Sequence, residues 1–186
     1  LGPGAGGFPF AKTIAPGVRV VAIDAARPTA FTDASGLCGK AQLAAFSELL
    51  AADTRAVTLV AMHYGLLRWK GVADKPHHRM LDWEDVLQVI DASPARIALV
   101  LHGHMHGAFA ARTDKCPIIC AGSAIDLMVD CGYFIYELDL DSLDLRIERR
   151  RWSRLRKAYE RVDCAEFEAA VREGRGAKLA HQTPLT

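Results

Sequence analysis

Three short apolar runs dominate the pattern of hydrophobic and polar positions. They cover Val18–Ile23, Val57–Met62 and Ile97–Leu101, and each is followed directly by an aspartate or a histidine. Continuous runs of β-branched and apolar residues are typical of strands that are buried on both faces. We therefore predict three adjacent core strands that present polar side chains where they leave the core.

Segments with helical spacing separate these runs. Between Gly39 and Ala52 the apolar side chains recur every three or four residues, and a second such segment follows between Asp82 and Asp91. Asp82 is the expected N-cap of the second helix, with acidic residues in its first turn. Strands that alternate with helices indicate an α/β fold built on a parallel sheet.

The remaining segments predict further strands and one more helix. Residues 109–112 and 117–121 are short strand candidates, and Tyr133–Leu140 and Leu143–Ile147 alternate as a hairpin joined at Asp141 and Ser142. Residues 1–17 are rich in Gly and Pro and are expected to form a loop. The tail from Trp152 to Glu173 is expected to be a basic helix with a solvated face, because acidic residues interrupt its basic run.

Composition narrows the possible functions. The chain has 186 residues, of which 51% are hydrophobic and 24% charged, as is typical of a single globular domain. Its net charge of +1 creates no overall electrostatic field that would favour binding to nucleic acid or to a membrane. No apolar run has the length of a membrane span. An odd number of cysteines with no Cys-x-x-Cys pair suggests reduced thiols and a cytoplasmic protein. The five cysteines are Cys38, Cys116, Cys120, Cys131 and Cys164.

Histidines gather where the third apolar run ends. The stretch Leu99–Gly107 carries His102, His104 and His106, with Gly103 inside the cluster and Gly107 directly after it. If the backbone is extended there, residues two apart point the same way, so His104 and His106 can face one metal ion. The alternative is a polar loop whose histidines face solvent.

A further histidine, His63, ends the neighbouring run. The carboxyl ends of parallel strands meet at one edge of a sheet, and ligand sites of α/β proteins lie at that edge. His63, His104 and His106 are therefore expected to converge, although 41 positions separate the first two in the sequence.

Three sequence motifs resemble those of the calcineurin-like metallophosphoesterases: AMHYGLL around His63, LVLHGHMHG around the histidine cluster, and IICAGSA at 118–124. The resemblance covers roughly residues 18–140. It implies a four-layer α/β/β/α sandwich that hydrolyses phosphate esters with two metal ions (Mn, Fe or Zn) bridged by a hydroxide. It also implies that His63 and His104 bind the second metal, that His106 binds the first, and that His102 gives second-shell support or contacts solvent.

The chain departs from the family because the Asp-x-His, Gly-Asp and Gly-Asn-His motifs are absent. Residues 1–150 are accordingly expected to be the C-terminal part of such a domain, and residues 151–186 a helical, basic extension. The catalytic residues are expected in an N-terminal half that is absent from this sequence, cleaved or separately encoded. The chain is expected to be weak or inactive alone, and to associate with that half or with itself. The loop 64–81, with Lys75, His77, His78 and Arg79, is expected to shape the pocket, either as a phosphate contact or as an exposed basic loop.

Other interpretations remain. The metallo-β-lactamase-like pattern needs Asp-His soon after its His-x-His pair, but Gly107 and Ala108 follow His106. Amidohydrolase barrels need more downstream strands than this chain has. A scaffold or interaction domain that kept the fold and lost catalysis is the alternative outside the enzymes.

Overall fold

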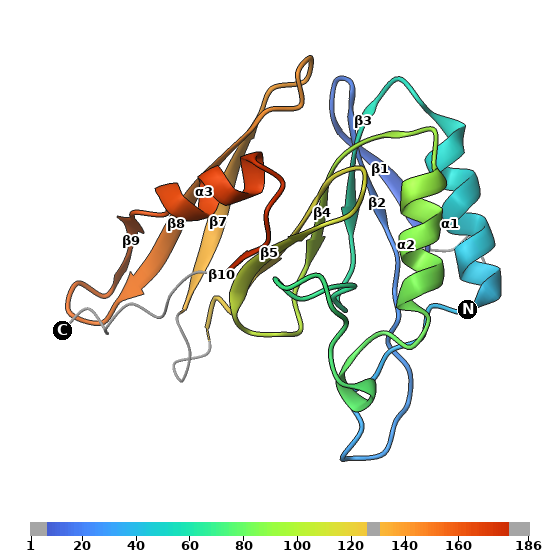
Figure 1. Cartoon of the computed structure of the whole chain (residues 1–186), viewed down its shortest axis with the longest axis horizontal. Coiled ribbons are helices and arrows are strands. Elements are labelled where there is room, and N and C mark those ends of the chain that lie inside the picture. Colours follow the sequence, from blue (N-terminus) through green and yellow to red (C-terminus); the bar gives the residue numbers. More distant parts are fainter. Residues whose placement is uncertain (1–6, 126–130, 179–186) are drawn as a thin grey trace.

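A computed structural model describes residues 7–125 and 131–178, which form an α/β fold with a large mixed sheet, a small antiparallel sheet and three helices (Figure 1). The strands are β1 (Phe10–Ala15), β2 (Val18–Ala22), β3 (Val57–Ala61), β4 (Arg96–His102), β5 (Ala108–Arg112), β6 (Pro117–Ala121), β7 (Gly132–Leu138), β8 (Leu145–Ser153), β9 (Ala158–Val162) and β10 (Ala177–Lys178). The helices are α1 (Lys40–Ala52), α2 (Trp83–Ala92) and α3 (Ala165–Arg172), with a 3₁₀ turn, η1, at Pro76–His78.

The three apolar runs form adjacent core strands, as predicted. The large sheet has the order β1-β2-β3-β4-β6-β5-β10, in which β2, β3, β4 and β6 are parallel neighbours. Val21, Val60 and Val100 are fully buried in the centre of these strands. The parallel arrangement brings the carboxyl ends of β3 and β4, and therefore the histidines that follow them, to one edge of the sheet.

Helices α1 and α2 cover one face of the large sheet (Figure 1). Phe46 and Leu50 of α1 and Ile90 of α2 are fully buried against it. Asp82 precedes α2 as predicted, but its carboxylate does not cap that helix. It accepts hydrogen bonds from the backbone N–H groups of Cys38 and Gly39, at 3.0 and 2.7 Å, and so ties the starts of the two helices together.

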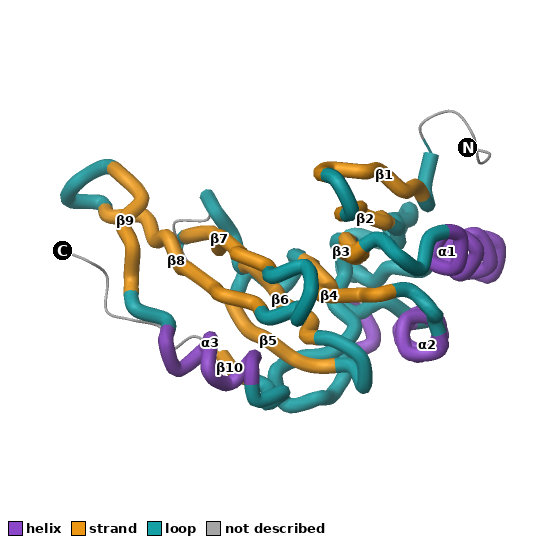
Figure 2. Tube along the Cα trace, turned by 90° about the horizontal axis from the view of Figure 1, so that it is seen from above, coloured by secondary structure: helices purple, strands orange, loops and turns teal. Residues whose placement is uncertain are grey.

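The small sheet, β7-β8-β9, packs with α3 against the opposite face of the large sheet. Phe134 of β7 stacks on Phe167 of α3 with ring centroids 5.3 Å apart, and Ile147 of β8 joins the same apolar cluster. Seen from above, the small sheet diverges from the β1–β2 end of the large sheet (Figure 2). The hairpin predicted at Asp141 and Ser142 is confirmed, within a turn that runs from Leu138 to Leu145.

Two predictions at the ends of the chain are wrong. Residues 10–15 are a strand rather than loop, because the Pro16–Gly17 turn, with Gly17 at φ 73°, folds β1 back onto β2 as an antiparallel edge strand. The tail from Trp152 is not one helix. Strand β8 continues through the predicted domain boundary at 150/151 to Ser153, β9 follows, and only Ala165–Arg172 is helical.

The described part of the chain includes no helix that is both long and apolar enough to span a membrane. All five cysteines are free thiols and buried.

Candidate metal centre

The candidate centre lies where β3 and β4 leave the sheet. The backbone hydrogen-bond ladder extends one step beyond the strands, since the N–H of Gly103 donates to the carbonyl of His63 at 3.1 Å. This bond fixes the start of the histidine cluster beside the residue that ends β3. Backbone contacts thereby hold two segments that are far apart in the sequence side by side.

The rings of His63 and His104 face each other across this junction. Nε2 of His63 lies 3.2 Å from Nδ1 of His104, and the ring planes meet nearly edge to face, at 76°. Two unprotonated ring nitrogens repel at this distance, so a proton or a cation must lie between them. The structure therefore brings together the two residues that the family resemblance assigns to the same metal ion.

The surroundings of His104 hold its ring in place. Its Nε2 lies 3.2 Å from the carbonyl oxygen of His78, and its ring packs between His78 and Tyr64, with centroid distances of 4.3 and 4.4 Å. Burial, together with the neighbouring His78 and His63, lowers the pKa of His104 from 6.5 to about 4. His104 is therefore neutral at pH 7, which is the form that binds metals.

The backbone through the cluster is not extended, so the condition under which His104 and His106 would point the same way is not met. His104 and His106 have left-handed φ values of 65° and 55°. Each lies at the centre of a three-residue turn, because the N–H of Met105 donates to Gly103 and the N–H of Gly107 donates to Met105, both at 2.7 Å. The alternation of side chains that would point His104 and His106 the same way is lost in these turns.

His106 is not brought into one ligand set with the other two. Its side chain is exposed, and its carbonyl accepts a hydrogen bond from Ser123 at 3.2 Å. Within residues 7–125 and 131–178, no three or more His, Cys, Asp or Glu side chains are grouped so that they could hold a metal ion. The predicted convergence of three histidines is thus reduced to a pair.

His102 is buried in the core, so of its two predicted roles, second-shell support or a solvent contact, the solvent contact is wrong. Its side chain lies directly against Gly65, where an added Cβ would stand 2.6 Å from the ring, and beside Phe109. Nδ1 lies 3.1 Å from the carbonyl of Gly103, so the ring supports the first turn of the cluster. Burial lowers the pKa of His102 to about 4.

The loop after His63 contributes residues that the sequence pattern did not identify. Asp74 binds the Nδ1 of His78 at 2.9 Å and the guanidinium of Arg68 at 2.8 Å. Burial alone raises the pKa of Asp74, but hydrogen bonds from His78, the Lys75 backbone and Arg68 lower it overall. Of the loop residues expected to contact phosphate, His78 lies against His104, whereas the side chains of Lys75 and His77 are exposed. The sequence offers no local signal for the contact between Asp74 and His78, since Asp74 lies in irregular backbone and His78 in the short turn η1.

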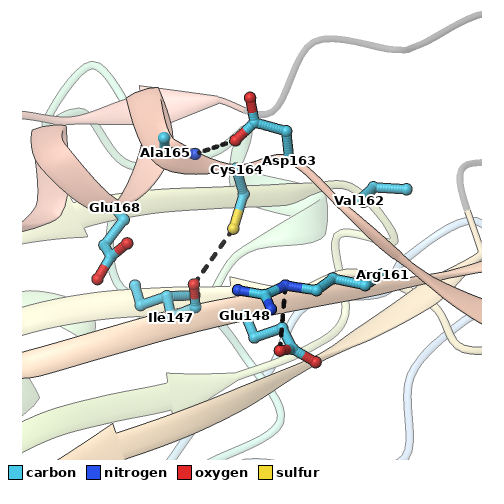
Figure 3. Close-up of a pocket in the computed structure, with 8 residues that line it drawn as sticks. All are labelled: Ile147, Glu148, Arg161, Val162, Asp163, Cys164, Ala165 and Glu168. Atoms are coloured by element: carbon cyan, nitrogen blue, oxygen red, sulfur yellow. Dashed lines mark hydrogen bonds and ion pairs between the residues drawn. The ribbon is translucent and has the colours of Figure 1, made fainter.

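A separate pocket of about 410 Å³ opens between β8, β9 and α3 (Figure 3). Its polar groups are largely engaged with one another. Arg161 pairs with Glu148 at 3.2 Å, and the Cys164 thiol donates to the carbonyl of Ile147 at 3.3 Å. Burial raises the pKa of Cys164, so the thiol stays protonated and is a poor nucleophile. We therefore place the candidate site at the histidines.

The histidine pair fits a metal ion. Two nitrogens bound to one tetrahedral zinc ion at about 2.0–2.1 Å lie about 3.3 Å apart, close to the separation of the His63 and His104 nitrogens. Because a carbonyl can only accept, Nε2 of neutral His104 carries the proton and Nδ1 is free to bind. A cation would replace the proton now shared between the two rings. Further ligands would have to come from outside this pair.

Comparison with known proteins adds little. No protein-family model matches the chain, and no curated protein is significantly similar to it. Among solved structures, it is similar to "GAP50 the anchor in the inner membrane complex of Plasmodium", with 12% identity and a TM-score of 0.43. That match covers 94% of this chain and 54% of the other, so the chain spans about half of that protein's length.

Proposed function

We propose that this chain is the C-terminal half of a four-layer metallophosphoesterase and supplies part of a metal centre for the hydrolysis of phosphate esters. His63 and His104 are the ligands of one ion in this proposal, and His106 serves a second ion once the other half is in place. The observation that carries the proposal is the 3.2 Å approach of the two ring nitrogens at adjacent parallel strand ends.

The chain's own residues have defined tasks in this proposal. His63 and His104 present unprotonated nitrogens to the cation, and the turn that follows β4 holds His104 in position. His102 supports that turn through the contact of its Nδ1 with the carbonyl of Gly103, and it stays neutral because burial lowers its pKa. When bound, the pair of ions would supply Lewis-acid chemistry, since it would neutralise phosphate charge and lower the pKa of a water molecule.

The groups that would complete the centre are expected in the other half of the domain. Two imidazoles leave most positions of a metal ion open, and a dinuclear centre also needs a bridging ligand. The absent Asp-x-His, Gly-Asp and Gly-Asn-His motifs are the ones that supply such groups in the family. The chain alone is therefore expected to bind metal weakly and to hydrolyse phosphate esters poorly.

A metal titration of the full 186-residue chain tests this proposal. Zn²⁺ binding is followed by calorimetry in the wild type and in the variants H63A and H104A. Each variant is expected to weaken binding by at least about tenfold, because each removes one of the two ligands. The matched control is H77A, which removes an exposed histidine of the neighbouring loop and is expected to leave binding unchanged.

Two results would contradict the proposal. Zn²⁺ binding that is equal in the wild type, H63A and H104A would show that the pair is not a ligand site. Rapid Mn²⁺-dependent hydrolysis of an aryl phosphate by this chain alone would show that a different mechanism operates, since the residues expected to complete the centre are absent.

A scaffold or interaction domain that retains the fold without catalysis is the alternative. One observation favours it: the described residues contain no cluster of three potential ligands. This alternative predicts that adding an N-terminal half with the three missing motifs restores association but no phosphoesterase activity. The proposed function predicts that the same addition restores both.

A further inference from the structure

The loop between β3 and α2 contains a chain of contacts that ends on His104. Arg68 donates to one oxygen of the Asp74 carboxylate at 2.8 Å, and the Nδ1 of His78 binds the other at 2.9 Å. The carbonyl of His78 then accepts from His104 Nε2 at 3.2 Å. Neither the family resemblance nor the spacing of the histidines assigns a role to Asp74.

The position of the His78 carbonyl is set from several directions. The turn η1 is closed by a bond from the His78 N–H to Lys75 at 2.9 Å. The backbone carbonyls on either side of the His78 carbonyl are also held. The carbonyl of His77 accepts a hydrogen bond from the N–H of Ala34 at 2.8 Å, and that of Arg79 accepts one from the N–H of Gly36 at 3.0 Å. The Asp74 carboxylate, with a side chain only 10% exposed, fixes the ring of the same residue. The carbonyl therefore cannot turn away from His104 without breaking bonds on both sides.

This carbonyl decides which nitrogen of His104 is available. A neutral imidazole carries one proton, and a carbonyl at Nε2 keeps it there, which leaves Nδ1 unprotonated toward His63. If the carbonyl moved, the other tautomer would place a proton on Nδ1, where it would compete with a metal ion. Partners that fix the tautomer of a ligand commonly change metal affinity by about 10–100-fold.

We propose that Asp74 and His78 form a positioning clamp, braced by Arg68, whose backbone carbonyl holds His104 in the tautomer that presents Nδ1 to the metal ion. This inference rests on the proposed function, in which His104 is a ligand. Asp74 and His78 are positioning residues here and do not themselves bind the ion. The rings of His78 and His104 lie close together, with centroids 4.3 Å apart and planes tilted by 35°.

The test uses the full chain and two measurements. In the metal-free chain, nitrogen-15 NMR of the histidine rings reports the tautomer of His104. The wild type is expected to carry the proton on Nε2, and D74N to show a mixture of tautomers. Zn²⁺ titration is expected to show roughly 10–100-fold weaker binding for D74N. D139N is the control, because Asp139 also accepts several hydrogen bonds but lies in the β7–β8 turn.

Two variants of His78 separate positioning from direct ligation. H78N keeps a side-chain N–H that can donate to Asp74, whereas H78A removes it. The clamp predicts that H78N binds Zn²⁺ within about threefold of the wild type and that H78A falls to the level of D74N. If both variants lose binding equally while D74N does not, His78 contacts the ion itself and the clamp is wrong.

The remaining outcomes are equally decisive. A D74N chain with wild-type tautomer and wild-type affinity overturns the inference. A wild-type chain that binds no Zn²⁺ through His63 and His104 overturns the proposed function instead, and the tautomer comparison in the metal-free chain then still decides whether the clamp exists. Thermal unfolding of each variant checks that the fold is retained.

Discussion

Replacing Arg19 with methionine should destabilise the β2–α1–β3 unit that carries His63. Arg19 is only 6% exposed, and its guanidinium closes the C-terminal end of α1. It donates to Thr58 Oγ1 and to the carbonyls of Leu49 and Leu50, each at 2.9 Å, and to that of Asp53 at 2.7 Å. A cation at this position also opposes the negative end of the helix dipole.

The expected loss follows from the groups left without partners. Thr58 Oγ1 and the Leu50 carbonyl are buried, and a buried orphan costs about 1–3 kcal/mol. Methionine refills the apolar volume, so R19M should lose about 3 kcal/mol and its Tm should fall by roughly 6–12 °C. Urea unfolding of R19M is compared with R55M, which removes an exposed arginine close to the same helix end. A loss below about 1 kcal/mol for R19M would refute the view that this contact fixes the helix.

Three further outcomes are expected. G65A should lose about 1–3 kcal/mol, because the new Cβ meets the His102 ring at 2.6 Å, whereas G107A, with its nearest contact at 3.8 Å, should unfold like the wild type. With EDTA present, the free energy of unfolding should fall by up to about 3 kcal/mol as the pH drops from about 6.5 to 4. Over this range His102 is protonated in the unfolded chain but stays neutral in the folded chain, where its pKa is about 4. H102N should lose the His102 share of that slope and keep the share of His104, whose pKa is also lowered to about 4. The chain should self-associate in sedimentation experiments, because β1 exposes Phe10 and Ile14 on an edge strand; a well-behaved monomer at all concentrations would contradict this.

The core of the large sheet could be predicted because its signal is local. Each of β2, β3 and β4 is rich in apolar residues, and this pattern is typical of strands that are buried on both faces. Edge strand β1 lacks this signal. All its residues are exposed, and backbone pairing with β2, rather than burial, keeps it in the sheet.

The second strand of the predicted hairpin ended at Ile147, whereas β8 continues to Ser153, because the further inward positions of β8 are not apolar. Arg149 and Arg151 of β8 point into the protein alongside Ile147, and Arg149 is 1% exposed. Arg149 lies over the ring of Phe134 at 4.9 Å and donates to the carbonyl of Ala121 at 3.1 Å. A pattern that treats arginine as solvated cannot recognise such a strand, since the burial depends on partners elsewhere in the chain.

In the candidate site, too, some contacts could be predicted from the sequence and others could not. The approach of His63 and His104 follows from topology, because both residues leave parallel neighbouring strands at the same edge. The place of His106 depends on left-handed backbone at two non-glycine residues, which no hydrophobic pattern encodes. The contact between Asp74 and His78 depends on how an irregular loop returns to the sheet.

The incomplete ligand set of the proposed metal centre and the exposed edge strand lead to the same physical expectation. Two imidazoles hold a metal ion weakly, and the exposed side of His63 leaves room for ligands from another polypeptide. If those ligands arrive with a partner that pairs with β1, ion binding and association each lower the free energy of the other. Pairing at the edge of β1 would then add to the free energy of association, which two metal ligands alone make only weakly favourable. The ion would in turn favour partners that carry the missing ligands. A partner that only covered the apolar edge would leave the affinity of His63 and His104 for the ion unchanged.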